Sequence, residues 1–236
     1  MKEQRGIWQI IWIEMSKSFV WFWSILLGFI VLGIALSMIY EPSEVIFQTN
    51  AAMYIYFAVI GAQLFKLGLN YGSTMGSTRH QLYTGVVLSA LVLAAIGTAI
   101  HSVVYYSFGP LAQGLTSGMD LIHLLGLLPV EETVFTVILF DFSTSLMALG
   151  LSFAFSILYY KYGGLPLMIA GGVVALSVMY SPIRNSFWGE IVSWIMTGGA
   201  VELFAIPLVF AALAFSLPYL LVVRLNIYLK ESASLK

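Results

Sequence analysis

Two ionisable residues, His101 and Asp141, lie within long apolar runs of the chain. An ionised, unpaired carboxylate at the centre of a bilayer costs roughly 2.5–3.5 kcal/mol on insertion scales, so Asp141 must face protein, water or a proton. Asp141 lies about eight residues from the end of its run and His101 about seven from the end of the preceding run, which gives them a similar depth at 1.5 Å per residue. We therefore predict a hydrogen bond or ion pair between them. A structural pair is the favoured interpretation, and a substrate or proton site is the alternative.

The chain offers little other recognisable chemistry. The three histidines are too scattered for an HExxH or HxxxH metal motif, and the absence of cysteine excludes a disulfide framework, an iron–sulfur cluster and a thiol nucleophile. A glycine-rich loop followed by Lys-Ser or Lys-Thr is also missing, so the chain cannot cradle ATP phosphates by itself. The sequence thus predicts no catalytic residue, no cofactor and no metal site, and we do not expect an enzyme.

Composition points to an integral membrane protein. Of the 236 residues, 60% are hydrophobic and only 9% are charged, against about 45–50% and 25% in soluble domains. A net charge of -1 leaves no basic surplus for nucleic acid, so nucleic acid is excluded as a main partner.

The apolar runs are long enough for helices that cross a hydrocarbon core about 30 Å thick. We predict an all-α fold with six transmembrane helices in a single domain, 1–236, without internal repeats. The predicted spans are 19–40, 45–64, 84–108, 133–160, 162–180 and 202–223.

The distribution of Lys and Arg predicts the orientation of these spans. Nine of the ten basic residues fall on one side, and Arg184 stands alone on the other. Because Lys and Arg are enriched in cytoplasmic loops, both termini are expected in the cytoplasm and the chain in the plasma membrane.

An apolar stripe precedes the first span. It falls at i, i+3, i+4 and i+7, typical of one helix face, and predicts a helix over 1–18 lying in the cytoplasmic interface. The alternative is a cytoplasmic extension of the first span. The stripe consists of Trp8, Ile11, Trp12 and Met15.

The cytoplasmic connection between the second and third spans, 66–83, is rich in glycine and hydroxyl residues. Ser77 or Thr78 is expected to N-cap a short helix that leads through Arg79 into the third span. Such a helix would project into the cytoplasm as a docking element; the alternative is a solvated turn.

Two further connections lie on the outer side. The segment 181–201 has apolar residues at helical spacing up to Gly198 and Gly199, which predicts short interfacial or re-entrant helices between the fifth and sixth spans. The connection 109–132 contains an apolar patch too short to span, and we expect a surface helix there.

This order of parts resembles the membrane subunit of ABC-2 type ABC transporters, which include bacterial exporters and immunity transporters for peptides and antibiotics. The resemblance is carried by the Trp-rich stretch 7–15, the first span, the run Gly-Ser-Thr-Arg-His-Gln-Leu-Tyr at 76–83 and the segment between the fifth and sixth spans. It covers nearly the whole chain and depends on architecture more than on a diagnostic string.

The resemblance implies a non-catalytic permease in a bacterial cytoplasmic membrane. A second permease subunit, identical or related, and separate ATP-binding subunits that hold ATP and Mg would be its partners, and a hydrophobic or amphipathic substrate would be exported. The interfacial helix would abut the ATPase, and the segment 73–83 would be the coupling helix, with Arg79 as its main polar contact. By position, the coupling residues would be Ser73, Ser77, Thr78, Arg79, His80 and Gln81.

Two other classes of function stay open. A stand-alone transporter or channel-like protein could use Asp141 and His101 for protons, but would be expected to show repeats or broken helices paired across two halves. An accessory or immunity protein could bind a toxic peptide in the membrane without transporting it.

Overall fold

The fold is nearly all helical. The computed structural model describes residues 2–40, 45–74, 78–116 and 119–223. Five helices in this part of the chain are long and apolar enough to cross a membrane. They are α1 (Lys2–Tyr40), α2 (Thr49–Thr74), α3 (Arg79–Leu115), α4 (Val134–Tyr162) and α8 (Ala200–Val223).

The predicted fifth span, 162–180, corresponds to a shorter helix that ends at a sharp bend. Helix α5 (Leu165–Met179) has 15 residues, a length of about 22 Å that falls short of the hydrocarbon core. A bend of 82° separates it from the helical stretch that follows. That stretch consists of α6 (Ser181–Ile183), the π-helix η2 (Arg184–Trp188) and α7 (Gly189–Thr197). The described residues therefore form five long apolar helices, or up to six passages if the bent pair is counted as one.

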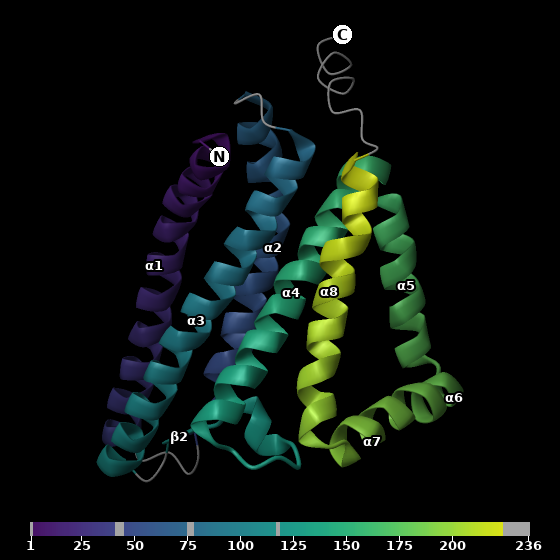
Figure 1. The fold of residues 1–236 in the computed structure, drawn as a ribbon. Helices are drawn as coiled ribbons and strands as arrows, with labels where there is room; N and C mark the ends of the chain where they lie inside the picture. Colours follow the sequence, from purple (N-terminus) through teal and green to yellow (C-terminus); the bar gives the residue numbers. More distant parts are fainter. Residues whose placement is uncertain (1, 41–44, 75–77, 117–118, 224–236) are drawn as a thin grey trace.

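The two ends of the bundle differ, as Figure 1 shows. At one end α1 begins, α2 gives way to α3, α4 gives way to α5, and α8 ends; we call this the terminal end. At the other end lie β2, α6 and α7, and we call this the strand end. All predicted cytoplasmic connections lie at the terminal end, as expected for six passages.

Helix α4 is the centre of the packing. It contacts α2, α3 and α8, and its buried apolar residues include Val137, Leu149, Phe153 and Ile157. Thr133 caps its start, and Gly163, with φ of 77°, ends it in a conformation that favours glycine. By contrast, α5 exposes nearly its whole circumference in the isolated chain and stands apart from α1 to α3 (Figure 1).

A short parallel sheet joins two connections at the strand end. Strand β1 (Val45–Phe47) pairs with β2 (Met119–Leu121), with Phe47 opposite Leu121. A 3-10 turn, η1 (Leu124–Leu127), follows β2 and buries Leu125. The predicted surface helix in 109–132 is therefore wrong: a strand and one tight turn fold back onto the bundle, because Met119, Leu121 and Leu125 bury their side chains.

The separate interfacial helix predicted over 1–18 is also wrong. Helix α1 runs from Lys2 to Tyr40 without a break, which is the alternative of an extended first span. No glycine or proline stands between Ile7 and Leu27, so nothing in the sequence interrupts the helix. Within the predicted stripe, Ile11 and Met15 are buried, whereas Trp12 is 37% exposed; the side chain of Trp8 lies outside the described ones.

The predicted separate coupling helix is not found in the described residues. Ser73 belongs to α2, whereas Arg79, His80 and Gln81 form the first turn of α3; Ser77 lies outside the described residues. The start of α3 itself is as predicted. Thr78 accepts a hydrogen bond from the Gln81 N–H, and the Gln81 side chain accepts one from the Thr78 N–H, which completes a capping box.

Replacing the cap tests this start directly. We expect Thr78→Ala to lower the free energy of unfolding by about 1 kcal/mol, because the first turn of α3 loses an acceptor for an otherwise unpaired N–H. Thr78→Ser keeps that acceptor and should stay close to the parent. Thermal unfolding in detergent measures both variants, and equal losses for alanine and serine would contradict the cap.

Candidate functional site

Asp141 is the centre of a polar cluster in which Thr49, His101, His123 and Asp141 are buried and Tyr54 is half-buried. Its Oδ2 lies 2.6 Å from Nδ1 of His101, and its Oδ1 lies 3.0 Å from Nε2 of His123. The Tyr54 hydroxyl donates a hydrogen bond of 2.5 Å to Oδ1. Nε2 of His101 lies 2.9 Å from Oγ1 of Thr49. We call these five residues, Thr49, Tyr54, His101, His123 and Asp141, the His–Asp cluster.

Four different segments contribute to the cluster. Tyr54 comes from α2, His101 from the middle of α3 and Asp141 from the second turn of α4. The parallel strands position the other two residues: Thr49, the first residue of α2, lies two residues after β1, and His123 lies two residues after β2. Because the strands are parallel and in register, the chain leaves both in the same direction, and both residues reach the same place.

A backbone contact fixes the tautomer of His123. Its Nδ1 accepts a hydrogen bond of 3.0 Å from the Leu125 N–H, which caps the η1 turn. In a neutral imidazole only one ring nitrogen carries a proton. The proton of His123 is therefore on Nε2, which donates to Asp141. With His101 and Tyr54 also donating, the carboxylate receives three hydrogen bonds, which satisfy a charge that would otherwise be costly to bury.

Aromatic rings link the cluster to the surface. The Tyr105 ring stacks on His101, with ring centroids 6.3 Å apart and 19° between the planes. Its hydroxyl donates a hydrogen bond of 2.6 Å to Oε1 of Glu132, an exposed carboxylate just before α4. A negative charge thus lies at the surface, one aromatic ring away from His101.

Several polar atoms around the cluster lack a protein partner. Both amide atoms of the buried Asn50 are without a hydrogen bond, as are Nε1 of Trp23 and Oγ1 of Thr98. Asn50 is adjacent to Thr49 in the chain and close to the Tyr54 hydroxyl, and the Trp23 ring lies 6.5 Å from that of His101. Buried polar atoms without partners are unusual, which marks this layer as more than a close-packed helix interface.

The arrangement has two chemical capacities. As a hydrogen-bonded set it holds α2, α3, α4 and the η1 turn together. Its two imidazole nitrogens and its carboxylate also form a donor set suited to a metal ion, since all three ligand atoms lie within 4.8 Å of one another.

The predicted pair of His101 and Asp141 is confirmed. The structure places the remaining predicted site residues elsewhere: His80 and Gln81 are at the terminal end in the first turn of α3, and Nδ1 of His80 lies 3.3 Å from the Tyr219 hydroxyl on α8. Ile11 and Met15 lie on the buried face of α1 and belong to the hydrophobic core.

Three members of the cluster escaped the sequence analysis: Thr49, Tyr54 and His123. His123 lies in a connection that we expected on the surface, and nothing in its local spacing links it to Asp141. The one signal available was the patch of leucines that follows it, which is more apolar than an exposed loop requires.

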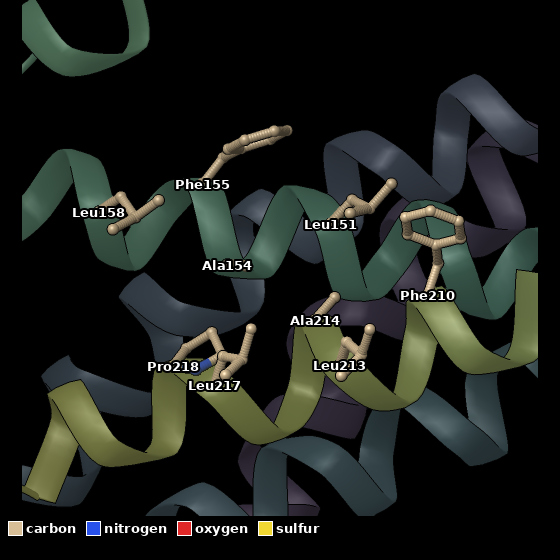
Figure 2. Close-up of a pocket in the computed structure, with 9 residues that line it drawn as sticks. All are labelled: Leu151, Ala154, Phe155, Leu158, Phe210, Leu213, Ala214, Leu217 and Pro218. Atoms are coloured by element: carbon tan, nitrogen blue, oxygen red, sulfur yellow. The ribbon is translucent and has the colours of Figure 1, made fainter. Parts of the chain in front are cut away.

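One apolar hollow lies beside the cluster and a second lies further along α4, and Asp141 lines neither of them. A partly open cavity of 630 Å³ lies between α4, α7, α8 and η1, and its lining includes Leu124, Phe140, Trp194 and Ile206. A groove of 410 Å³ follows the seam between α4 and α8 toward the terminal end. Figure 2 shows its nine lining residues, from Leu151 to Leu158 on α4 and from Phe210 to Pro218 on α8.

The predicted short helices between the last two passages are confirmed as α6, η2 and α7, and Gly198 ends α7 as expected. Helix α7 turns Ile191 and Ile195 toward the 630 Å³ cavity.

Comparison of the chain with protein-family models, with curated proteins and with solved structures finds no match.

Proposed function

We propose that the chain is the transmembrane subunit of an ATP-driven exporter of the ABC-2 type, with no catalysis of its own. One observation carries the proposal: the break between α5 and the short helices α6 to α7, at the end of the bundle opposite the chain's start. In the family that the sequence resembles, a pair of short helices occupies this place and caps the outer end of the pathway.

The exposed surface of the chain supports a partner within the membrane. Helix α5 exposes large apolar residues around most of its circumference, among them Met168, Val173 and Leu176. Such a surface can be covered by lipid or by a second permease subunit, identical or related. The proposed assembly is two permease subunits with two cytoplasmic ATP-binding subunits that hold ATP and Mg.

The apolar cavity supports a hydrophobic or amphipathic substrate, such as a peptide or antibiotic. Its lining is almost entirely apolar, and Thr144 and Glu202 are its few polar residues. Closure of the ATPase pair would press on the terminal end, and α4 and α8 would carry the motion to the cavity.

The contact with the ATPase gives a direct prediction. We expect Arg79→Ala to weaken binding of the ATPase subunit about 30-fold, as for a charged interface contact worth about 2 kcal/mol. Arg184→Ala, at the strand end, is the matched control and should bind as the parent does. Affinity measured in nanodiscs and ATP-driven uptake into inverted vesicles would both report the change.

Other outcomes identify the other classes of function. Transport driven by a proton gradient without ATP would indicate a stand-alone transporter that uses Asp141 and His101. Peptide binding without transport would indicate an accessory or immunity protein. If no ATPase subunit encoded beside this chain binds it, or if an impermeant reagent labels a cysteine placed at Arg79 only from outside the cell, the proposal fails.

A further inference from the structure

We infer that His101, His123 and Asp141 bind a divalent transition metal ion of the zinc type. The inference goes beyond the proposed transport function and does not depend on it. Two imidazoles and one carboxylate form a common ligand set for zinc, and their separation of 22 and 18 residues along the chain matches no linear motif. The fold brings them together from α3, the segment after β2, and α4.

The distances between the ligand atoms suit a small ion. Tetrahedral zinc, with bonds of about 2.0–2.1 Å, separates its ligand atoms by about 3.3 Å. The carboxylate oxygens now lie 2.6 Å from His101 and 3.0 Å from His123, and no two of the three ligand atoms are more than 4.8 Å apart. Small side-chain rotations therefore open the set to the required size. The fourth position is left to water, with the Tyr54 hydroxyl beside Oδ1.

The surroundings of His101 match those of a metal ligand. Bound histidines usually donate the proton of the other ring nitrogen to an acceptor, which fixes the orientation of the ring. When Nδ1 of His101 binds the ion, the ring proton moves to Nε2, where Oγ1 of Thr49 accepts it at 2.9 Å. His101 thus stays neutral and its outer partner is already in place.

Metal binding affects His123 differently, because it breaks a hydrogen bond whose loss can be measured. Binding at Nε2 moves its ring proton to Nδ1, where the Leu125 N–H now donates. Two N–H groups cannot share that contact, so the Leu125 N–H must give up its bond and the η1 turn must shift. Metal binding is therefore expected to loosen this turn, whose first residue, Leu124, lines the apolar cavity.

Access and solvation also favour a cation. Exposed Glu132, linked through Tyr105 to the face of His101, places a negative charge at the surface near the cluster. Asn50 follows Thr49 in the chain and Thr98 lies one turn before His101 on α3. The unpaired amide of Asn50 and the unpaired hydroxyl of Thr98 can bind water that accompanies the ion.

The test uses the full-length chain purified in detergent, stripped with a chelator and then given Zn²⁺ or Co²⁺. We expect one ion per chain, and tetrahedral Co²⁺ should show intense visible absorption. His101→Gln, His123→Gln and Asp141→Asn should each weaken binding more than 100-fold. Thr49→Val, which removes only the outer partner, should weaken it about 10–100-fold.

His80→Gln is the matched control, because His80 is the one histidine of the sequence outside the proposed ligand set and lies at the other end of the bundle. It should bind the ion as the parent does. Hydrogen exchange at Leu125 should accelerate in the loaded protein. The inference is overturned if the parent binds no ion at micromolar concentration, or if binding survives in His123→Gln or Asp141→Asn. Should a variant fail to fold, the Co²⁺ spectrum of the parent decides by itself.

Discussion

His101→Leu is expected to lower the free energy of unfolding by about 3–5 kcal/mol, because it leaves the buried Asp141 carboxylate without its shortest histidine contact. Tyr54 and His123 still donate to Oδ1, but Oδ2 loses its donor. Asp141→Leu should also destabilise, since it leaves three buried donors without an acceptor, at about 1–3 kcal/mol each.

The double variant at positions 101 and 141 tests whether the two side chains interact. If His101 and Asp141 interact, the combined loss is smaller than the sum of the two single losses by about 0.5–3 kcal/mol. Unfolding in detergent with a chelator present measures the hydrogen-bonded state alone. His80→Leu serves as the control and should change stability by less than about 0.5 kcal/mol. Additive losses at positions 101 and 141 would show that the two residues do not interact.

Gly61→Ala should destabilise the protein by about 1–3 kcal/mol, although alanine is the better helix former. Gly61 lies where α2 crosses α4, and an added Cβ would collide with Oγ of Ser152 and the carbonyl oxygen of Leu149 and lie 2.9 Å from Cα of Leu149. Two of these atoms are backbone, so no side-chain rotation relieves the clash and the helices must separate.

Gly28→Ala is the matched control on α1. An added Cβ there meets nothing within 4 Å, so the change should stabilise the protein by up to about 1 kcal/mol through helix propensity. The two glycines should therefore respond with opposite signs in the same thermal unfolding assay. A stabilising Gly61→Ala would contradict the close approach of α2 and α4.

The sequence predicted those features that depend on length and composition. A run of about 20 apolar residues forms a spanning helix almost regardless of its neighbours, and five of the six predicted spans correspond to long helices. Helix ends were less predictable. No glycine or proline opposes continuation of α1 before Phe19 as far as Ile7, and α2 continues beyond Lys66 despite Gly68 and Gly72, so both helices extend past the apolar runs.

Two of the five residues of the His–Asp cluster were predictable. Depth along two antiparallel helices placed His101 near Asp141 because a helix has a fixed rise per residue. The depth of His123 in the bundle could not be inferred in this way, because its position depends on two strands of three residues each. Such short strands carry no periodic signal, and their pairing spans more than 70 residues of the chain.

That small sheet has a mechanical consequence. By pairing the connection before α2 with the connection before α4, it links the four helices α1 to α4 at the strand end. Helices α5 to α7 lie outside this fastening; α5 contacts α4 and η2, and α7 contacts η2. The paired strands therefore join α1 to α4 at the strand end without including α5 to α7, so a change in the position of α5 to α7 requires no break in the sheet.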